Sequence, residues 1–105
     1  MSDKQYFLYK LLPPRPDFAF TMTPAEAAVM QAHGDYWDGL LAAGTAVVFG
    51  PVAEPTGAWG LGVLEVDDPA DADRVRAGDP AVTSGTLTAE VHPMVAGFAR
   101  PFAAA

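Results

Sequence analysis

The stretch Thr23–Gly44, TPAEAAVMQAHGDYWDGLLAAG, decides how the rest of the chain is arranged. Thr23 can cap a helix, Pro24 suits the first helical position, and Glu26 completes a capping box. We predict a helix that begins here and runs to about Ala43. Its apolar side chains recur at three- and four-residue spacing, so one face should pack against a sheet. That stripe consists of Ala27, Met30, His33, Trp37, Leu40, Leu41 and Gly44.

The segments on either side of this helix predict four strands and a second helix. Apolar runs bounded by proline or glycine indicate strands, whereas Asp68-Pro69 is typical of a helix start. We expect strands at 5–12, 45–49, 58–66 and 86–92, a helix at 67–77, and loops at 13–22 and 79–85. The order β-α-β-β-α-β predicts an α+β, ferredoxin-like fold, in which both helices cover one face of a four-stranded antiparallel sheet.

Composition limits the possible function. The chain has 105 residues, a formal charge of −7 and no cysteine, and half of its residues are hydrophobic. We therefore expect one domain over 1–105, without disulfides or thiolate metal sites. The acidic balance argues against partners such as nucleic acid or anionic membranes. Neither a membrane-spanning run nor a signal peptide is evident, which favours a cytoplasmic protein.

The predicted strands are apolar on both faces, although the helices cover only one. Water would then contact a large apolar surface, which folded monomers rarely expose. We expect a homodimer in which the uncovered faces of two sheets pack together.

His33 is the first candidate for chemistry because it lies on the apolar stripe of the first helix. An imidazole there faces the sheet, where a carboxylate could set its charge state. A core histidine with one satisfied hydrogen bond is the alternative interpretation.

Asp79 is the second candidate. Pro80 pushes it toward extended geometry, so its carboxylate could turn inward and orient His33. The alternative is an Asx turn at the end of the second helix.

Other residues could bind a substrate or close the site. Aromatic side chains provide possible pocket walls, and a hydroxyl near Asp79 provides a possible donor; these are Phe18, Phe20, Phe49, Trp59 and Ser84. The loop 13–22 could border the pocket as a lid, or its phenylalanines could plug the core. The spacing of His and acidic residues supports no metal site, and we expect no cofactor.

Several short motifs occur in an order that resembles the YCII-related domain family. They are an aromatic first strand, His33 followed by Tyr36-Trp37, Gly50-Pro51 after the second strand, and Asp79-Pro80 before Gly85. The resemblance implies a dimeric α/β-barrel, built on the ferredoxin-like fold, with His33 and Asp79 paired in its pocket. The insertion at 13–22 and the small residues Ala81-Val82 depart from the family pattern and affect the expected pocket shape.

Two hypotheses about function follow. In the first, the domain is a lyase or isomerase in which the His33–Asp79 pair transfers protons on a small, partly apolar molecule. In the second, it is a non-catalytic domain that binds a small molecule or serves as a dimerising accessory module. Acyl transfer is disfavoured because no activated nucleophile is evident.

Overall fold

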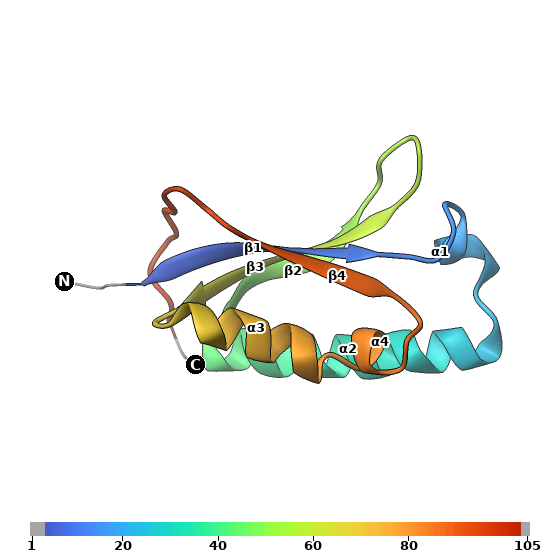
Figure 1. Ribbon diagram of the computed structural model, residues 1–105, viewed down its shortest axis with the longest axis horizontal. Helices are drawn as coiled ribbons and strands as arrows, with labels where there is room; N and C mark the ends of the chain where they lie inside the picture. Colours follow the sequence, from blue (N-terminus) through green and yellow to red (C-terminus); the bar gives the residue numbers. More distant parts are fainter. Residues whose placement is uncertain (1–3, 104–105) are drawn as a thin grey trace.

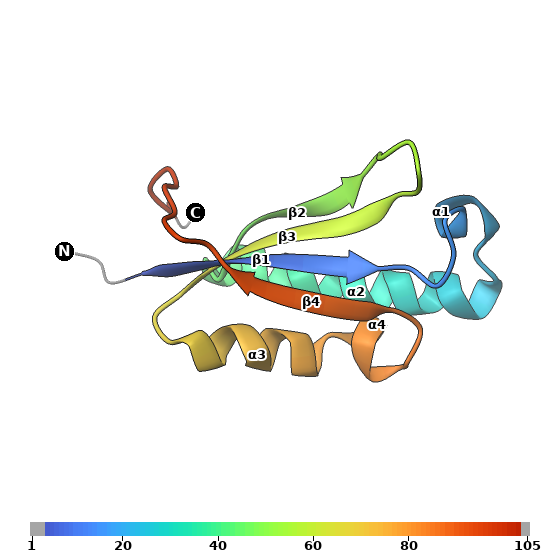
Figure 2. The ribbon, with the colours of Figure 1, turned by 45° about the horizontal axis from the view of Figure 1, so that its top comes forward.

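The computed structural model describes residues 4–103 and places helices on one face of a four-stranded antiparallel sheet (Figures 1 and 2). This confirms the α+β class and the arrangement expected of a ferredoxin-like fold. The elements are β1 (Gln5–Leu12), α1 (Phe18–Thr21), α2 (Pro24–Ala43), β2 (Ala46–Val52), β3 (Trp59–Val66), α3 (Pro69–Gly78), α4 (Pro80–Thr83) and β4 (Thr88–Pro93).

The strands are ordered β2-β3-β1-β4, so the first strand lies in the interior of the sheet. Phe7, Tyr9 and Leu11 of β1 are buried and point toward the helices, because alternate residues of a strand share one face. The outer strands β2 and β4 contain Pro51 and Pro93 respectively.

The helix α2 has the predicted ends. The Thr23 side chain accepts a hydrogen bond from the Glu26 amide, and the Glu26 side chain accepts one from the Thr23 amide. At the other end, Gly44 adopts φ 81°, a left-handed conformation that favours glycine. The buried Trp37 fixes the rotation of α2 against the sheet.

The structure corrects several predicted boundaries. The stretches 13–22 and 79–85 are not loops throughout, because each contains a one-turn helix, α1 and α4. The strand β2 continues through Gly50 and Pro51 to Val52, because an edge strand tolerates a proline that lacks a ladder donor. The last strand begins at Thr88, two residues after the predicted start at Thr86.

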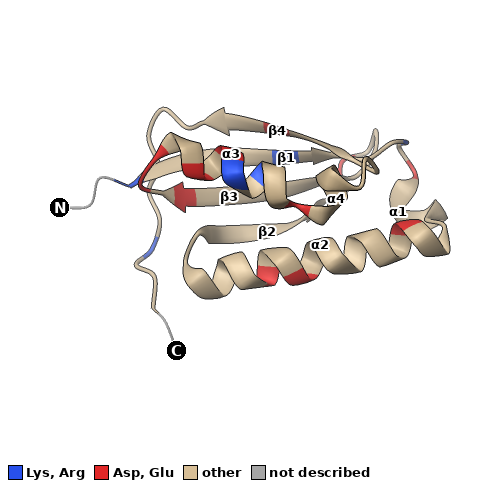
Figure 3. Cartoon of the chain, turned by 60° about the horizontal axis from the view of Figure 1, so that its bottom comes forward, with Lys and Arg blue, Asp and Glu red and all other residues tan. Residues whose placement is uncertain are grey.

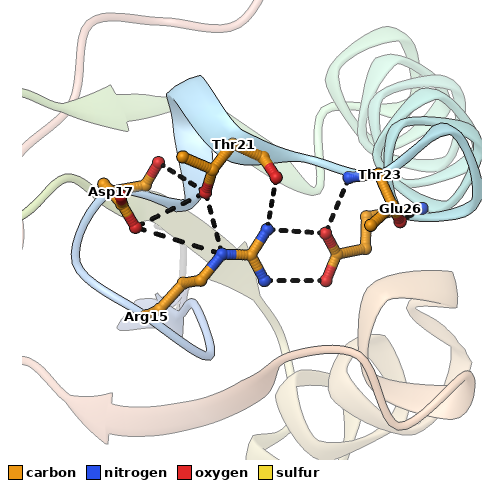
Figure 4. A network of polar contacts seen from close by, with 5 residues as sticks. All are labelled: Arg15, Asp17, Thr21, Thr23 and Glu26. Atoms are coloured by element: carbon orange, nitrogen blue, oxygen red, sulfur yellow. Dashed lines mark hydrogen bonds and ion pairs between the residues drawn. The ribbon is translucent and has the colours of Figure 1, made fainter.

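A polar network ties α1 to the start of α2 (Figure 4). The two terminal nitrogens of Arg15 donate to the two carboxylate oxygens of Glu26 at 3.0 and 2.7 Å. Arg15 also donates to the Thr21 side chain and carbonyl at 2.8 and 2.7 Å. Its guanidinium lies 5.2 Å from the ring centroid of Phe18. We call these contacts the Arg15 clasp.

Figure 3 marks acidic residues along both long helices and basic residues on α3. Arg74 pairs with Asp71, and Arg76 lies 3.8 Å from Asp73. These i,i+3 pairs belong to the exposed surface of α3, where such contacts contribute little to stability.

Candidate functional site

Asp79 occupies the junction between α3 and α4. Its backbone is extended, with φ −71° and ψ 121°, as expected for a residue before proline. Its carboxylate turns inward and accepts a hydrogen bond from the Ala81 amide at 2.9 Å, so Asp79 is also the N-cap of α4. Its exposed fraction is 0%. A fully buried carboxylate needs several donors to remain charged.

His33 provides one of these donors. Its Nδ1 lies 2.8 Å from Oδ1 and 3.0 Å from Oδ2 of Asp79. This contact links α2, which carries His33, to the α3–α4 junction. The predicted approach of these two side chains is therefore confirmed. The His33 side chain is 13% exposed, so the pair lies at the inner end of an opening to the surface.

Two further donors come from residues that the sequence did not single out for the site. The Tyr9 hydroxyl and the Trp37 indole N–H both donate to Oδ2 of Asp79, at 2.9 and 3.0 Å. Tyr9 is on β1 and Trp37 is one turn after His33 on α2, so the carboxylate joins three separate parts of the chain. The position of Trp37 on the His33 stripe was the signal that could have identified it.

These contacts determine the charge of Asp79. Burial by itself raises the pKa of the Asp79 carboxyl, but hydrogen bonds from His33, Trp37 and Ala81 outweigh it and hold the pKa below its ordinary value. Burial, and then the charge of Asp79, raises the pKa of Tyr9 far above its ordinary value. Asp79 is thus ionised, and the Tyr9 hydroxyl stays protonated as a donor.

The ionised carboxylate selects the tautomer of His33. A carboxylate can only accept hydrogen bonds, so Nδ1 of His33 must carry the proton that points to Asp79. The second nitrogen, Nε2, then has a lone pair in the neutral ring. None of the hydrogen bonds found among residues 4–103 uses Nε2.

Gly62 allows Trp37 to reach this position. A Cβ at Gly62 would lie 2.4 Å from Cη2 of the Trp37 ring, so only glycine permits the indole to lie against β3. Trp37 also contacts Tyr9 edge to face, with ring centroids 4.8 Å apart, and lies 5.7 Å from the Phe49 ring. Aromatic packing therefore holds two of the donors to Asp79, Tyr9 and Trp37, in place.

A small pocket of about 110 Å³ opens beside His33. Its walls are mostly apolar; they are Tyr9, Leu11, His33, Trp37, Phe49, Gly50, Pro51, Gly60 and Leu61. Since the hydroxyl of Tyr9 and the indole N–H of Trp37 are engaged by Asp79, His33 is the titratable group available to a bound molecule. Asp79 lies behind His33 and does not line the pocket.

The other predicted site residues lie in different places. Phe49 lines the His33 pocket, while Phe18 and Trp59 line a neighbouring hollow. Phe20 is 91% exposed and lines neither. Ser84 is also exposed, and its hydroxyl lies 2.9 Å from that of Thr86. The loop 13–22 thus turns one phenylalanine into the core and the other toward solvent.

Two further properties concern residues 4–103 as a whole. They contain no group of three or more His, Cys, Asp or Glu side chains placed to hold a metal ion. Within the same range, none of the helices has both the length and the apolar character needed to cross a membrane.

Comparison with protein families gives a match over most of the chain. The model of the YCII-related domain matches residues 7–95, which include every strand except the first two residues of β1. A comparison with curated proteins found no match.

Proposed function

Because the chain belongs to the YCII-related domain family, we propose that it is a lyase or isomerase in which His33 transfers a proton on a small, partly apolar molecule. The supporting observation is the hydrogen bond from Nδ1 of His33 to the buried, ionised Asp79. This bond leaves Nε2 as the basic atom of a residue that lines the pocket.

The reaction would proceed by general base and then general acid catalysis. Nε2 of His33 removes a proton from a carbon activated by a neighbouring carbonyl, and Asp79 stabilises the imidazolium that forms. The imidazolium then returns the proton to another atom of the same molecule, or to a departing group. Asp79 is a positioning residue here, because its lowered pKa keeps it from taking the proton itself.

The pocket favours proton transfer over acyl transfer. No serine, threonine or cysteine is among its lining residues, and the Tyr9 hydroxyl is committed to Asp79. Covalent catalysis needs a nucleophile with an adjacent base. Elimination or isomerisation requires only the base and a way to return the proton.

We further propose that two chains associate through the uncovered sheet face. Leu8 of β1 and Val63 of β3 are paired across the strands on that face, and Val48 of β2 pairs with Val63 and is 49% exposed. Apolar side chains at adjacent positions support a dry contact between two sheets. Sedimentation should give a dimer for the natural chain and a monomer for Val63→Lys.

The activity test measures exchange of acidic C–H protons in D₂O by NMR, using a panel of small cyclic ketones and lactones. His33→Gln should abolish the exchange, because an amide cannot act as the base. His92→Gln is the matched control, since His92 is exposed and pairs with Glu90 away from the pocket. Exchange that survives in His33→Gln would refute the proposal, and binding without exchange in the natural chain would favour the accessory-domain alternative.

A further inference from the structure

A second apolar hollow of about 60 Å³ lies next to the His33 pocket. It is lined by Leu11, Pro13, Phe18, Ala19, Ala58, Trp59, Gly60 and Leu87. Two of these residues, Leu11 and Gly60, also line the His33 pocket, so they form the boundary between the two spaces.

This boundary is thin because Gly60 has no side chain. A Cβ at Gly60 would lie 3.0 Å from Cβ and 3.3 Å from Cδ2 of Leu11. The Leu11 side chain therefore fills the space that a larger residue at position 60 would take. Leucine can change rotamer, so a ligand group could displace it more easily than it could displace backbone.

Both spaces suit uncharged groups. None of the residues that line them is an aspartate, glutamate, lysine or arginine. Trp59 is also uncharged, and its polar contacts lie with other residues, because its indole N–H donates to Glu54 at 3.0 Å and Lys10 lies over its ring. The His33 pocket approaches the size of a cavity of roughly 150 Å³ that binds benzene, whereas the second hollow has room only for a short alkyl group.

The far wall of the second hollow is held in place before any ligand binds. Phe18 is buried, and the Arg15 clasp fixes the one-turn helix α1 that carries Phe18 and Ala19. A preformed wall binds an apolar group without the entropy cost of ordering a loop.

We infer that the second hollow is a subsite for an apolar substituent of the molecule whose polar end faces His33. This inference rests on the proposed function and narrows its substrate class. The substrate is a small, uncharged ring or carbonyl compound that carries a short alkyl group on the side away from the reacting proton.

The test uses phenol, para-cresol, para-ethylphenol and para-propylphenol as probes, with affinities measured by calorimetry on the natural chain. Phenol offers an O–H to Nε2 of His33 and a ring to the pocket, while the para group extends toward the second hollow. Each buried CH₂ should tighten binding about fourfold until the hollow is full.

Two variants fill the second hollow from opposite sides, Ala19→Leu on α1 and Ala58→Leu before β3. The control is Ala25→Leu, which adds the same side chain to an exposed helical position that lines neither space. Phenol should bind all four proteins with equal affinity. The increase in affinity from phenol to the larger para-alkylphenols should persist only in the natural chain and Ala25→Leu.

The outcomes separate the inference from the proposed function. Affinities that do not rise along the series, or that rise equally in Ala19→Leu and Ala58→Leu, overturn the subsite and leave the role of His33 intact. Failure of every probe to bind the natural chain overturns the subsite as well. Loss of proton exchange in His33→Gln is measured separately and decides the proposed function.

Discussion

Replacing Gly62 by alanine tests how far the site depends on the position of Trp37. The added Cβ would lie 2.4 Å from Cη2 and 2.7 Å from Cζ3 of the indole, so the ring must move. Trp37 is 1% exposed and packs against Tyr9 and Phe49, so apart from the small His33 pocket that it lines it has little space to move into.

The expected cost has two parts. Overpacking of a core by one methyl group costs about 1–3 kcal/mol. Movement of the indole also lengthens its hydrogen bond to Asp79, and a bond to a charged group contributes about 1.5–3 kcal/mol. Alanine offsets about 0.5–1 kcal/mol of this, because its backbone loses less conformational entropy on folding than that of glycine. The net loss in the free energy of unfolding should be about 2–5 kcal/mol.

The assay is urea unfolding followed by tryptophan fluorescence, with Gly39→Ala as the matched control. Gly39 is in the interior of α2, and a Cβ there would meet nothing within 4 Å. The same substitution should therefore stabilise the protein by up to about 1 kcal/mol at this position. A Gly62→Ala protein as stable as the natural chain would show that Trp37 is not held as argued, and that its bond to Asp79 is dispensable.

Three more predictions concern the polar contacts. Asp79→Asn should lower the free energy of unfolding by about 3–5 kcal/mol at neutral pH. Because folding lowers the pKa of the Asp79 carboxyl, the difference between the natural chain and the variant should shrink in urea titrations as the pH falls below 3.8. Tyr9→Phe should cost about 1–3 kcal/mol by chemical unfolding, more than Tyr36→Phe, whose hydroxyl donates to a neutral carbonyl. Glu26→Gln should lower the thermal midpoint above pH 4.5, and the difference should disappear toward pH 2. The reason is that hydrogen bonding from Arg15 lowers the pKa of Glu26 to about 2. Equal midpoints of the two proteins at neutral pH would refute this prediction.

The elements that the sequence predicted well carry their own boundary signals. The first strand is bounded by Gln5 and Leu12 as expected, because Pro13-Pro14 stops it. The helix α2 has a capping box at one end and a left-handed glycine at the other. The helices α1 and α4 were missed, since one turn is too short to establish a helical period.

Some contacts of the candidate site could also be predicted from the sequence, and others could not. The pairing of His33 with Asp79 could be predicted, because the helical stripe and the residue before proline each restrict where a side chain points. The donation from Tyr9 could not, because it depends on how β1 is positioned relative to a junction 70 residues later in the chain. The outward position of Phe20 also follows from α1, whose single turn separates it from the buried Phe18.

The two prolines in the outer strands restrict how copies of this chain can associate. An exposed edge strand offers unpaired amides and carbonyls, to which a strand of another molecule can bond and so continue the sheet. Pro51 in β2 and Pro93 in β4 each remove an amide, and they do so at both sides of the sheet. At these positions a ladder of hydrogen bonds from molecule to molecule would lack a donor, which disfavours open-ended, fibre-like growth and favours the association through the sheet face that we propose.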